Sequence, residues 1–181
     1  MSQLNYDLTP HQAEQDLTYT IAADLVKHSN QPHMQYKISV VDTTRKKLCM
    51  VCFPNRIIIS RAVLLMCLDM KNISQWEMVG ILDDFSINLA PYVCKDYLAA
   101  LIAHELIHIM EKHFKNKNFI QQRLAEFECD NKGSNLLIKA GYAPCAFESI
   151  FRIALRFGAT HPHVTFQERI SKLKVRMLRK Y

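Results

Sequence analysis

His104-Glu105-Leu106-Ile107-His108 is the stretch that decides the interpretation of this chain. An α-helix has about 3.6 residues per turn, so positions 104 and 108 lie on one face and both imidazoles can reach one metal ion. Glu105 then lies beside the metal, where its carboxylate can take a proton from water. Zinc lowers the pKa of a bound water from about 16 to about 7, and the glutamate completes its activation for attack on a peptide carbonyl.

The helix expected over residues 99–113 is apolar on nearly every side, which predicts that it is buried. Unpaired polar groups in such a helix cost about 1 to 3 kcal/mol each, so its two histidines and its glutamate need partners. A metal ion satisfies all three together. The alternative is an ordinary amphipathic helix whose histidines share a solvated face. Its apolar residues, which disfavour that alternative, are Leu101, Ile102, Ala103, Leu106, Ile107, Ile109 and Met110.

A catalytic zinc site needs a third protein ligand and an open position. A second helical pattern covers residues 119–140, and the short polar loop 115–118 predicts that the two helices pack as antiparallel neighbours. Glu126 and Asp130 share one face of this second helix. Glu128 lies on nearly the opposite side, four residues before Lys132, in the favourable order for an exposed ion pair. We therefore expect Glu126 to be the third ligand and Glu128 to be solvated.

Asp130 lies one turn beyond Glu126, where it can accept the remaining ring N–H of a zinc-bound histidine. Such a contact fixes the tautomer and orientation of the ring, and carboxylates commonly supply it. The alternative is a plain surface aspartate.

The sequence around these residues resembles a family of zinc peptidases. The similar segments are Glu126-Phe127-Glu128-Cys129-Asp130, Gly133, Leu136-Leu137, Ala140-Gly141-Tyr142-Ala143-Pro144, His161-Pro162, Glu168-Arg169-Ile170 and, upstream, residues 53–64. They are similar to the HtpX-like heat-shock proteases and CAAX prenyl endopeptidases, over roughly residues 36–173. The resemblance implies a gluzincin, with zinc held by two motif histidines and a glutamate, a strand-turn-strand before the catalytic helix, and later His-Pro and Arg-Ile segments.

The chain also departs from that family. Many relatives have Asn-Ala at the start of the upstream strand, where this chain has Cys49 and Met50. Because the edge of that strand is where the family is thought to hold the substrate backbone, substrate preference is expected to differ. The interval from His108 to Glu126 is short for the family. Residues 69–96 form a stretch longer than a tight connection needs, which is interpreted as a lid or an interaction surface.

His161, in the segment Thr160-His161-Pro162-His163, is the candidate for a group that hydrogen-bonds the tetrahedral oxyanion. The family's His-Pro segment supports this role, and the alternative is a loop histidine at a helix connection. Arg169 is expected either to reach the site or to pair with an acid across the core. The histidines given no role in the site are His11, His28, His33, His113 and His163.

Length and composition fit one compact domain over residues 1–181, which the motif and the resemblance lead us to expect to be a single zinc metallopeptidase domain. With 181 residues and 49% apolar residues, the chain can form a single core. Its start lacks the pattern of a secretory signal, and no apolar run approaches the roughly 18 residues of a membrane span. Six cysteines in such a chain are interpreted as reduced thiols with structural roles, including Cys49-x-x-Cys52. A soluble, cytoplasmic enzyme is the expectation.

The predicted fold class is α+β: a mostly helical, zincin-like metallopeptidase domain with a small antiparallel sheet and an active-site helix carrying HExxH. Strands are expected over residues 34–41, 48–53 and 56–60, with a tight turn at Pro54-Asn55. Further helices are expected over residues 10–28, 60–68 and 144–157 and from residue 165 to the C-terminus. Their end signals are capping boxes at residues 9–12, 74–77 and 165–168, proline at 144, and glycine at 141 and 158.

The net charge of +6 lies on the last helix, where residues 169–180 hold six basic residues and no acid. Cations stabilise the C-terminal turn of a helix, so a solvated helix end is the preferred interpretation. The alternative is a patch for nucleic acid, acidic lipid or an acidic partner. Without interleaved aromatic residues the nucleic-acid footprint is weak, and no nucleic-acid partner is expected.

Two functions follow as expectations. The first is a zinc metalloendopeptidase that hydrolyses a protein or peptide substrate, with Zn2+ on His104, His108 and Glu126, and with Glu105 as general base. Its substrate is expected to add as an extra antiparallel strand along residues 48–53, because a sheet edge holds an extended peptide without demanding a sequence. The second is a non-hydrolytic zinc-binding module for protein interaction. Glu105 favours the enzyme, because a structural zinc needs no general base.

Overall fold

A computed structural model describes residues 12–42, 50–68, 94–115, 118–143, 145–156 and 161–177. Several predicted features lie outside these residues: the capping boxes at 9–12 and 74–77, most of the stretch 69–96, part of the loop 115–118, Cys49, Pro144, Gly158 and the last four residues. The elements are α1 (Gln12–Lys27), β1 (Lys37–Val41), β2 (Met50–Phe53), β3 (Arg56–Ser60), α2 (Arg61–Leu68), α4 (Cys94–Met110), the 3-10 turn η2 (His113–Lys115), α5 (Phe119–Lys139), α6 (Ala146–Arg156) and α7 (Phe166–Met177).

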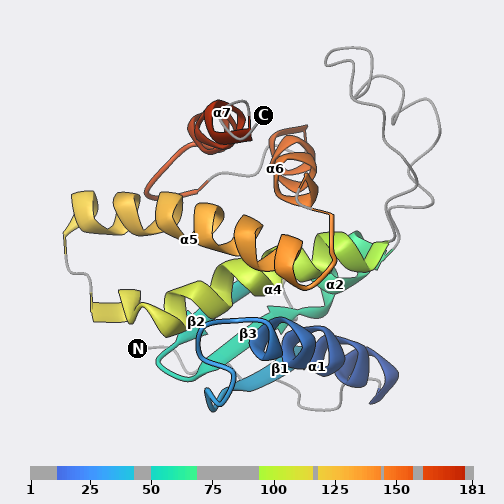
Figure 1. Ribbon diagram of the computed structural model, residues 1–181. Helices are drawn as coiled ribbons and strands as arrows, with labels where there is room; N and C mark the ends of the chain where they lie inside the picture. The colour runs from blue at the N-terminus through green and yellow to red at the C-terminus, as the bar shows by residue number, and fades with distance from the viewer. Residues whose placement is uncertain are drawn as a thin grey trace.

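The chain is mostly helical with one small sheet, as the predicted α+β class requires, but the sheet is mixed and not antiparallel (Figure 1). The strand order is β1-β3-β2, with β1 parallel to β3 and β2 antiparallel to it. The reason lies in β3, where three consecutive isoleucines, Ile57 to Ile59, are buried. A strand that is apolar on both faces takes the centre of a sheet and pairs on both sides. The tight turn at residues 54–55 determines the antiparallel pairing of β2 with β3, but it does not determine where β1 pairs.

Helix α4 lies at the centre of the structure, between the layer formed by the sheet with α1 and the layer that begins with α5 (Figure 1). It contacts α1, α2, α5, α6, β2 and β3. It starts at Cys94, earlier than the predicted residue 99, and Leu98 to Ala100, Ile102, Ala103 and Leu106 have no exposed surface. Helix α5 runs beside α4 in the opposite direction, as predicted. A buried helix fixed from all sides holds its polar side chains in one position.

Capping residues mark both ends of α5 and the start of α7. Asn118 caps α5 by accepting a hydrogen bond of 2.7 Å from the backbone N–H of Gln121. Gly141, with φ 79°, follows the last turn of α5 in the left-handed conformation that glycine adopts without strain. The capping box before α7 is confirmed. The backbone N–H of Thr165 donates to Glu168 at 2.9 Å, and that of Glu168 donates to the Thr165 hydroxyl at 3.2 Å.

The end of α4 differs from the prediction. The helix stops at Met110 and not at residue 113, and Lys112 has φ 58°. A left-handed conformation costs an L-residue about 1 to 2 kcal/mol, and no glycine or asparagine marks the position. This residue turns the chain into η2 and folds His113 back over the helix it has just left, toward His108.

Candidate metal centre

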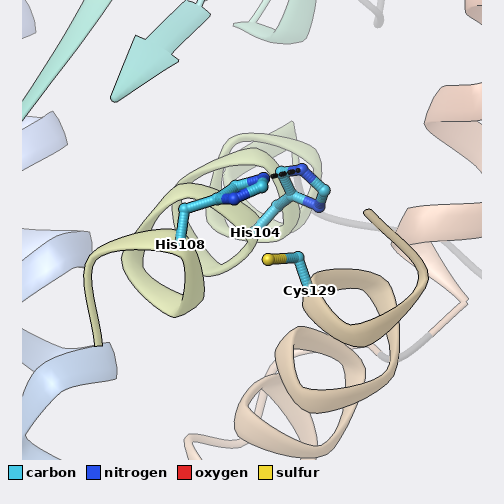
Figure 2. A group of neighbouring side chains, drawn as sticks. All are labelled: His104, His108 and Cys129. Atoms are coloured by element: carbon cyan, nitrogen blue, oxygen red, sulfur yellow. Dashed lines mark hydrogen bonds between the residues drawn. The ribbon is translucent and has the colours of Figure 1, made fainter. Parts of the chain in front are cut away.

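Two histidines and a cysteine meet between α4 and α5, in a group that can hold a metal ion (Figure 2). His104 and His108 project from one face of α4, and their Nε2 atoms are 3.1 Å apart. Cys129 projects from α5, and the ligand atoms of the three residues all lie within 4.8 Å of one another. His104 and Cys129 are buried and His108 is mostly buried, so an ion here would be held away from bulk water.

Glu126, the predicted third ligand, reaches the same two imidazoles. Its Oε2 lies 3.2 Å from Nε2 of His104, and its Oε1 lies 3.3 Å from Nε2 of His108. Zinc–nitrogen and zinc–oxygen bonds of about 2.0 to 2.1 Å would place tetrahedral ligands about 3.3 to 3.4 Å apart, close to these separations. Oε2 is buried, and beside His104 it also faces Nε2 of His161 and Nη1 of Arg169, each at 3.4 Å. A carboxylate whose two oxygens each face one of the two imidazole nitrogens fits a metal ion.

The chemistry of the donors favours Glu126 over Cys129 as the third ligand. Burial raises the pKa of the Cys129 thiol far above its usual value, and the neighbouring carboxylates of Glu126, Glu105 and Asp130 raise it further. Burial also acts to raise the pKa of Glu126, but the facing imidazoles of His104 and His108 outweigh it and hold that pKa well below the usual range. The carboxylate is therefore ionised and ready to bind, whereas the thiol must first lose a proton.

Asp130 and Arg169 lie beside Nδ1 of His104, the ring nitrogen that does not face Glu126. Oδ1 of Asp130 lies 3.0 Å from Nδ1 of His104, the contact predicted for this aspartate. Arg169 donates to both oxygens of Asp130, from Nη2 at 2.5 Å and from Nε at 2.8 Å, and its guanidinium lies 4.1 Å above the ring of Phe151. Nη2 is also 3.1 Å from Nδ1 of His104, but two N–H groups cannot bond each other, so Oδ1 accepts from both. With a metal ion bound, the Nδ1–H donated to Asp130 would leave the lone pair of Nε2 to bind the ion.

The charges of this group are balanced internally. Burial and the charge of Arg169 lower the pKa of His104, yet hydrogen bonds to Asp130 and Glu126 raise it to about 9. Burial acts to raise the pKa of Asp130, but the Arg169 charge and hydrogen bonds hold it below its usual value. Arg169 is only 4% exposed, so this basic residue of the last helix belongs to the core and not to a solvated helix end. The structure shows both roles considered for Arg169, because it pairs with Asp130 and its Nη1 also lies 3.4 Å from Oε2 of Glu126.

Glu105 lies on the side of α4 that faces β2. It is half-buried, and it accepts a hydrogen bond from the thiol of Cys52. Burial raises the pKa of Cys52, and the negative charge of Glu105 raises it further, so the thiol keeps its proton. In β2, Met50 and Cys52 are half-buried whereas Val51 and Phe53 are exposed. The sequence had suggested only a structural role for Cys52.

His161 reaches the same donor group from the segment before α7. Its Nε2 lies 3.4 Å from Oε2 of Glu126. The backbone N–H of His163 donates to Nδ1 of His161 at 3.3 Å, so Nδ1 carries the lone pair and Nε2 carries the proton. Burial lowers the pKa of His161 to about 4, although Glu126 acts to raise it. At neutral pH the ring is thus an uncharged donor aimed at the space beside Glu126.

His113, which the sequence had left without a role, lies against the site. Its Nδ1 is 3.3 Å from Nδ1 of His108 and 3.3 Å from Sγ of Cys129. Its Nε2 is 3.2 Å from Oε2 of Glu128, a residue expected to be only solvated. The predicted ion pair of Glu128 with Lys132 is present at 2.6 Å. Burial and the neighbouring His108 lower the pKa of His113, which keeps the ring neutral.

In comparisons with known proteins, no family model matches the chain and no curated protein matches it. The resemblance to zinc peptidases, which stands on sequence motifs, therefore stays a prediction. Within the described part of the chain, no helix is both long enough and apolar enough to cross a membrane. Among the described residues, Cys52, Cys129 and Cys145 are free thiols, as predicted for them.

Proposed function

We propose that the chain is a zinc metalloendopeptidase, with Zn2+ held by His104, His108 and Glu126. One observation carries the proposal: the Nε2 atoms of His104 and His108 and the two oxygens of the buried Glu126 carboxylate lie 3.1 to 3.3 Å apart, and Glu105, the residue after His104, is a carboxylate. The sequence similarity to HtpX-like and CAAX prenyl endopeptidases supports the same zincin-like activity. A bound zinc ion supplies Lewis acidity, which lowers the pKa of water to about 7 and polarises a carbonyl group.

The residues of the chain then have separate tasks in peptide hydrolysis. Glu105 takes the proton of the attacking water and returns it to the leaving amine. His161 donates its Nε2–H to the oxygen of the tetrahedral carbon, where preorganised donors contribute several kcal/mol, on the order of 3. Asp130 keeps Nδ1 of His104 protonated, and Arg169 holds Asp130 in place.

The substrate is proposed to bind along β2. This strand pairs with β3 on one side only, so among the described residues its other edge carries main-chain groups without a strand partner. An extended peptide can add there as a further strand and present its scissile carbonyl in fixed geometry. Cys52 of β2 bonds Glu105, so this strand lies next to the general base.

A second candidate function is a non-hydrolytic zinc-binding module. The observation in its favour is Cys129, whose sulfur belongs to the same group as His104 and His108. A zinc ion bound by two histidines, Glu126 and Cys129 would have four protein ligands and no open position, which is typical of structural sites. A bound metal can deprotonate a thiol outright, so the raised pKa of Cys129 alone does not decide between the two.

The deciding experiment compares Glu105→Gln with Glu111→Gln, which makes the same change at an exposed residue just beyond α4. Zinc content by elemental analysis should be one ion per chain in both. Cleavage of an unfolded protein such as casein should fall at least about a hundredfold in Glu105→Gln only, the scale for removing a positioned general base. Equal turnover in the two variants would refute the peptidase.

Cobalt substitution separates the candidates independently. A sulfur-to-cobalt charge-transfer band in the near ultraviolet, lost in Cys129→Ala, would establish thiolate ligation and the closed site. Under the peptidase proposal the band is absent, and Glu126→Ala, not Cys129→Ala, removes the bound metal.

A further inference from the structure

His113 packs against Nδ1 of His108, the ring nitrogen of this proposed zinc ligand that does not face Glu126. The two Nδ1 atoms of His113 and His108 are 3.3 Å apart, and the ring centroids are 5.2 Å apart at an interplanar angle of 82°. The position depends on Lys112, whose left-handed backbone turns the chain back at the end of α4. A strained residue that the surrounding structure maintains is typical of functional sites.

Glu128 holds the other side of the His113 ring. Its Oε2 lies 3.2 Å from Nε2 of His113. Lys132 fixes Glu128 at 2.6 Å, and Glu111 contacts the same ammonium group at 2.5 Å. The His113 side chain is only 9% exposed, whereas that of Glu128 is 42% exposed, so the chain of contacts runs from solvent to the metal centre.

The positions of the protons follow from these contacts. An ionised carboxylate only accepts, so Nε2 of His113 must donate to Glu128. In the neutral ring Nδ1 is then an acceptor, and it faces both the Cys129 thiol and Nδ1 of His108, each at 3.3 Å, so Nδ1–H of His108 can donate to it. His108 thereby keeps its proton on Nδ1 and presents the lone pair of Nε2 to the space between His104 and Glu126. Asp130 does the same for His104.

We propose that His113, oriented by Glu128, is a positioning residue that fixes the tautomer and ring orientation of His108 for metal binding. The proposal rests on the metal centre of the proposed function and extends it. Both zinc-binding histidines then have a dedicated partner behind the ring: a carboxylate for His104, and a neutral imidazole backed by a carboxylate for His108. A neutral imidazole adds no charge to a buried group that already holds Glu126, Asp130 and Arg169.

The test measures zinc affinity by competition with a chelator of known affinity. His113→Ala should weaken zinc binding by about 10- to 100-fold, the usual effect of removing such a partner. His113→Gln should restore much of the loss, because its amide oxygen can accept from His108 while its NH2 group donates to Glu128. His28→Ala is the matched control, since His28 pairs with Asp24 on α1 and should leave zinc affinity unchanged.

A second readout follows the proton itself. In the zinc-loaded parent, NMR should show the Nδ1–H of His108 as a ring proton that exchanges slowly with water, and His113→Ala should lose this signal or accelerate its exchange. A folded His113→Ala with the zinc affinity of the parent would overturn the proposal. Should this variant fail to fold, Glu128→Ala decides, with Glu111→Ala as control for the shared Lys132 contact. Weaker zinc binding in Glu128→Ala alone supports the relay, and equal affinity overturns it.

None of these readouts depends on proteolysis. A parent that binds zinc but cleaves nothing refutes the peptidase and leaves the role of His113 standing. A parent that takes up no zinc overturns both.

Discussion

Replacing Gly133 with alanine tests how closely the helices pack around the metal-binding group. A Cβ atom at this position would lie 2.7 Å from Cζ and 3.2 Å from Cε2 of Phe147. Phe147 is 1% exposed, and its ring centroid lies 5.9 Å from that of Phe151, so the Phe147 ring has little room to move away. The backbone nitrogen of His104 lies 3.5 Å from the same point, which is ordinary contact. The substitution therefore pushes mainly on one buried ring.

Two effects of opposite sign set the magnitude. Overpacking a core costs about 1 to 3 kcal/mol, and a contact this short belongs near the upper end of that range. Alanine is favoured over glycine inside a helix by about 1 kcal/mol, which offsets part of the loss. The net expectation is a decrease of about 2 kcal/mol in the free energy of unfolding, equivalent to a Tm lowered by about 4 to 8 °C in a chain of this size.

Denaturant unfolding and thermal melts of four proteins form the assay: the parent, Gly133→Ala, Phe147→Leu and the double variant. In the Phe147→Leu background the short contact disappears, so Gly133→Ala should become neutral or stabilising by up to about 1 kcal/mol. Gly141→Ala is the control. It should cost about 1 kcal/mol in either background, because its φ of 79° is strained for alanine and no atom lies within 4 Å of the added Cβ. A Gly133→Ala protein as stable as the parent would refute the packing argument.

Three further predictions concern the surroundings of the site. Lys112→Gly should raise the free energy of unfolding by about 0.5 to 1 kcal/mol in denaturant titration, because φ 58° is unstrained for glycine; a loss of stability would contradict this. NMR titration should place the midpoint of His161 near pH 4. Because its folded pKa is lowered, the stability from its neutral form is complete above about pH 6.5 and lost as the pH falls toward 4, and a midpoint above 6 would contradict the buried position. Met50→Pro, on β2, should reduce kcat/KM about five- to tenfold at unchanged zinc content, because the register of β2 on β3 turns the Met50 N–H toward the free edge, whereas that of Val51 bonds Ile58; unaltered kinetics would place the substrate elsewhere.

The helices were predictable because their signals are local. Helix α5 begins at Phe119 as predicted and ends one residue early, at Lys139, where Asn118 and Gly141 mark its two ends. The sheet shows the limit of local signals. The spacing of apolar residues identified β3 at residues 56–60, but strand order depends on which faces become buried, and β1 joined β3 as a parallel neighbour across the sheet.

The site was predicted where one helix face or one helical turn determined it. The spacing of His104 and His108, and the shared face of Glu126 and Asp130, brought those four residues together. His113 was missed because its approach depends on the left-handed backbone of Lys112, which no residue type announces. Glu128 was the available signal for His113. It lies two residues after Glu126, and in the antiparallel packing of α5 on α4 it lies opposite the end of α4, where an acid can pair with a histidine.

Strand β2 carries a consequence for the behaviour of the protein at high concentration. Val51 and Phe53 are 41% and 48% exposed, on a strand whose second edge is unpaired among the described residues. Open apolar edges are places where two copies of a chain can join and begin to aggregate. The strand is only four residues long and Pro54 follows it, and both features limit how far such pairing can extend. The edge proposed to receive a peptide is therefore also the place where the purified protein is expected to be most sensitive to self-association.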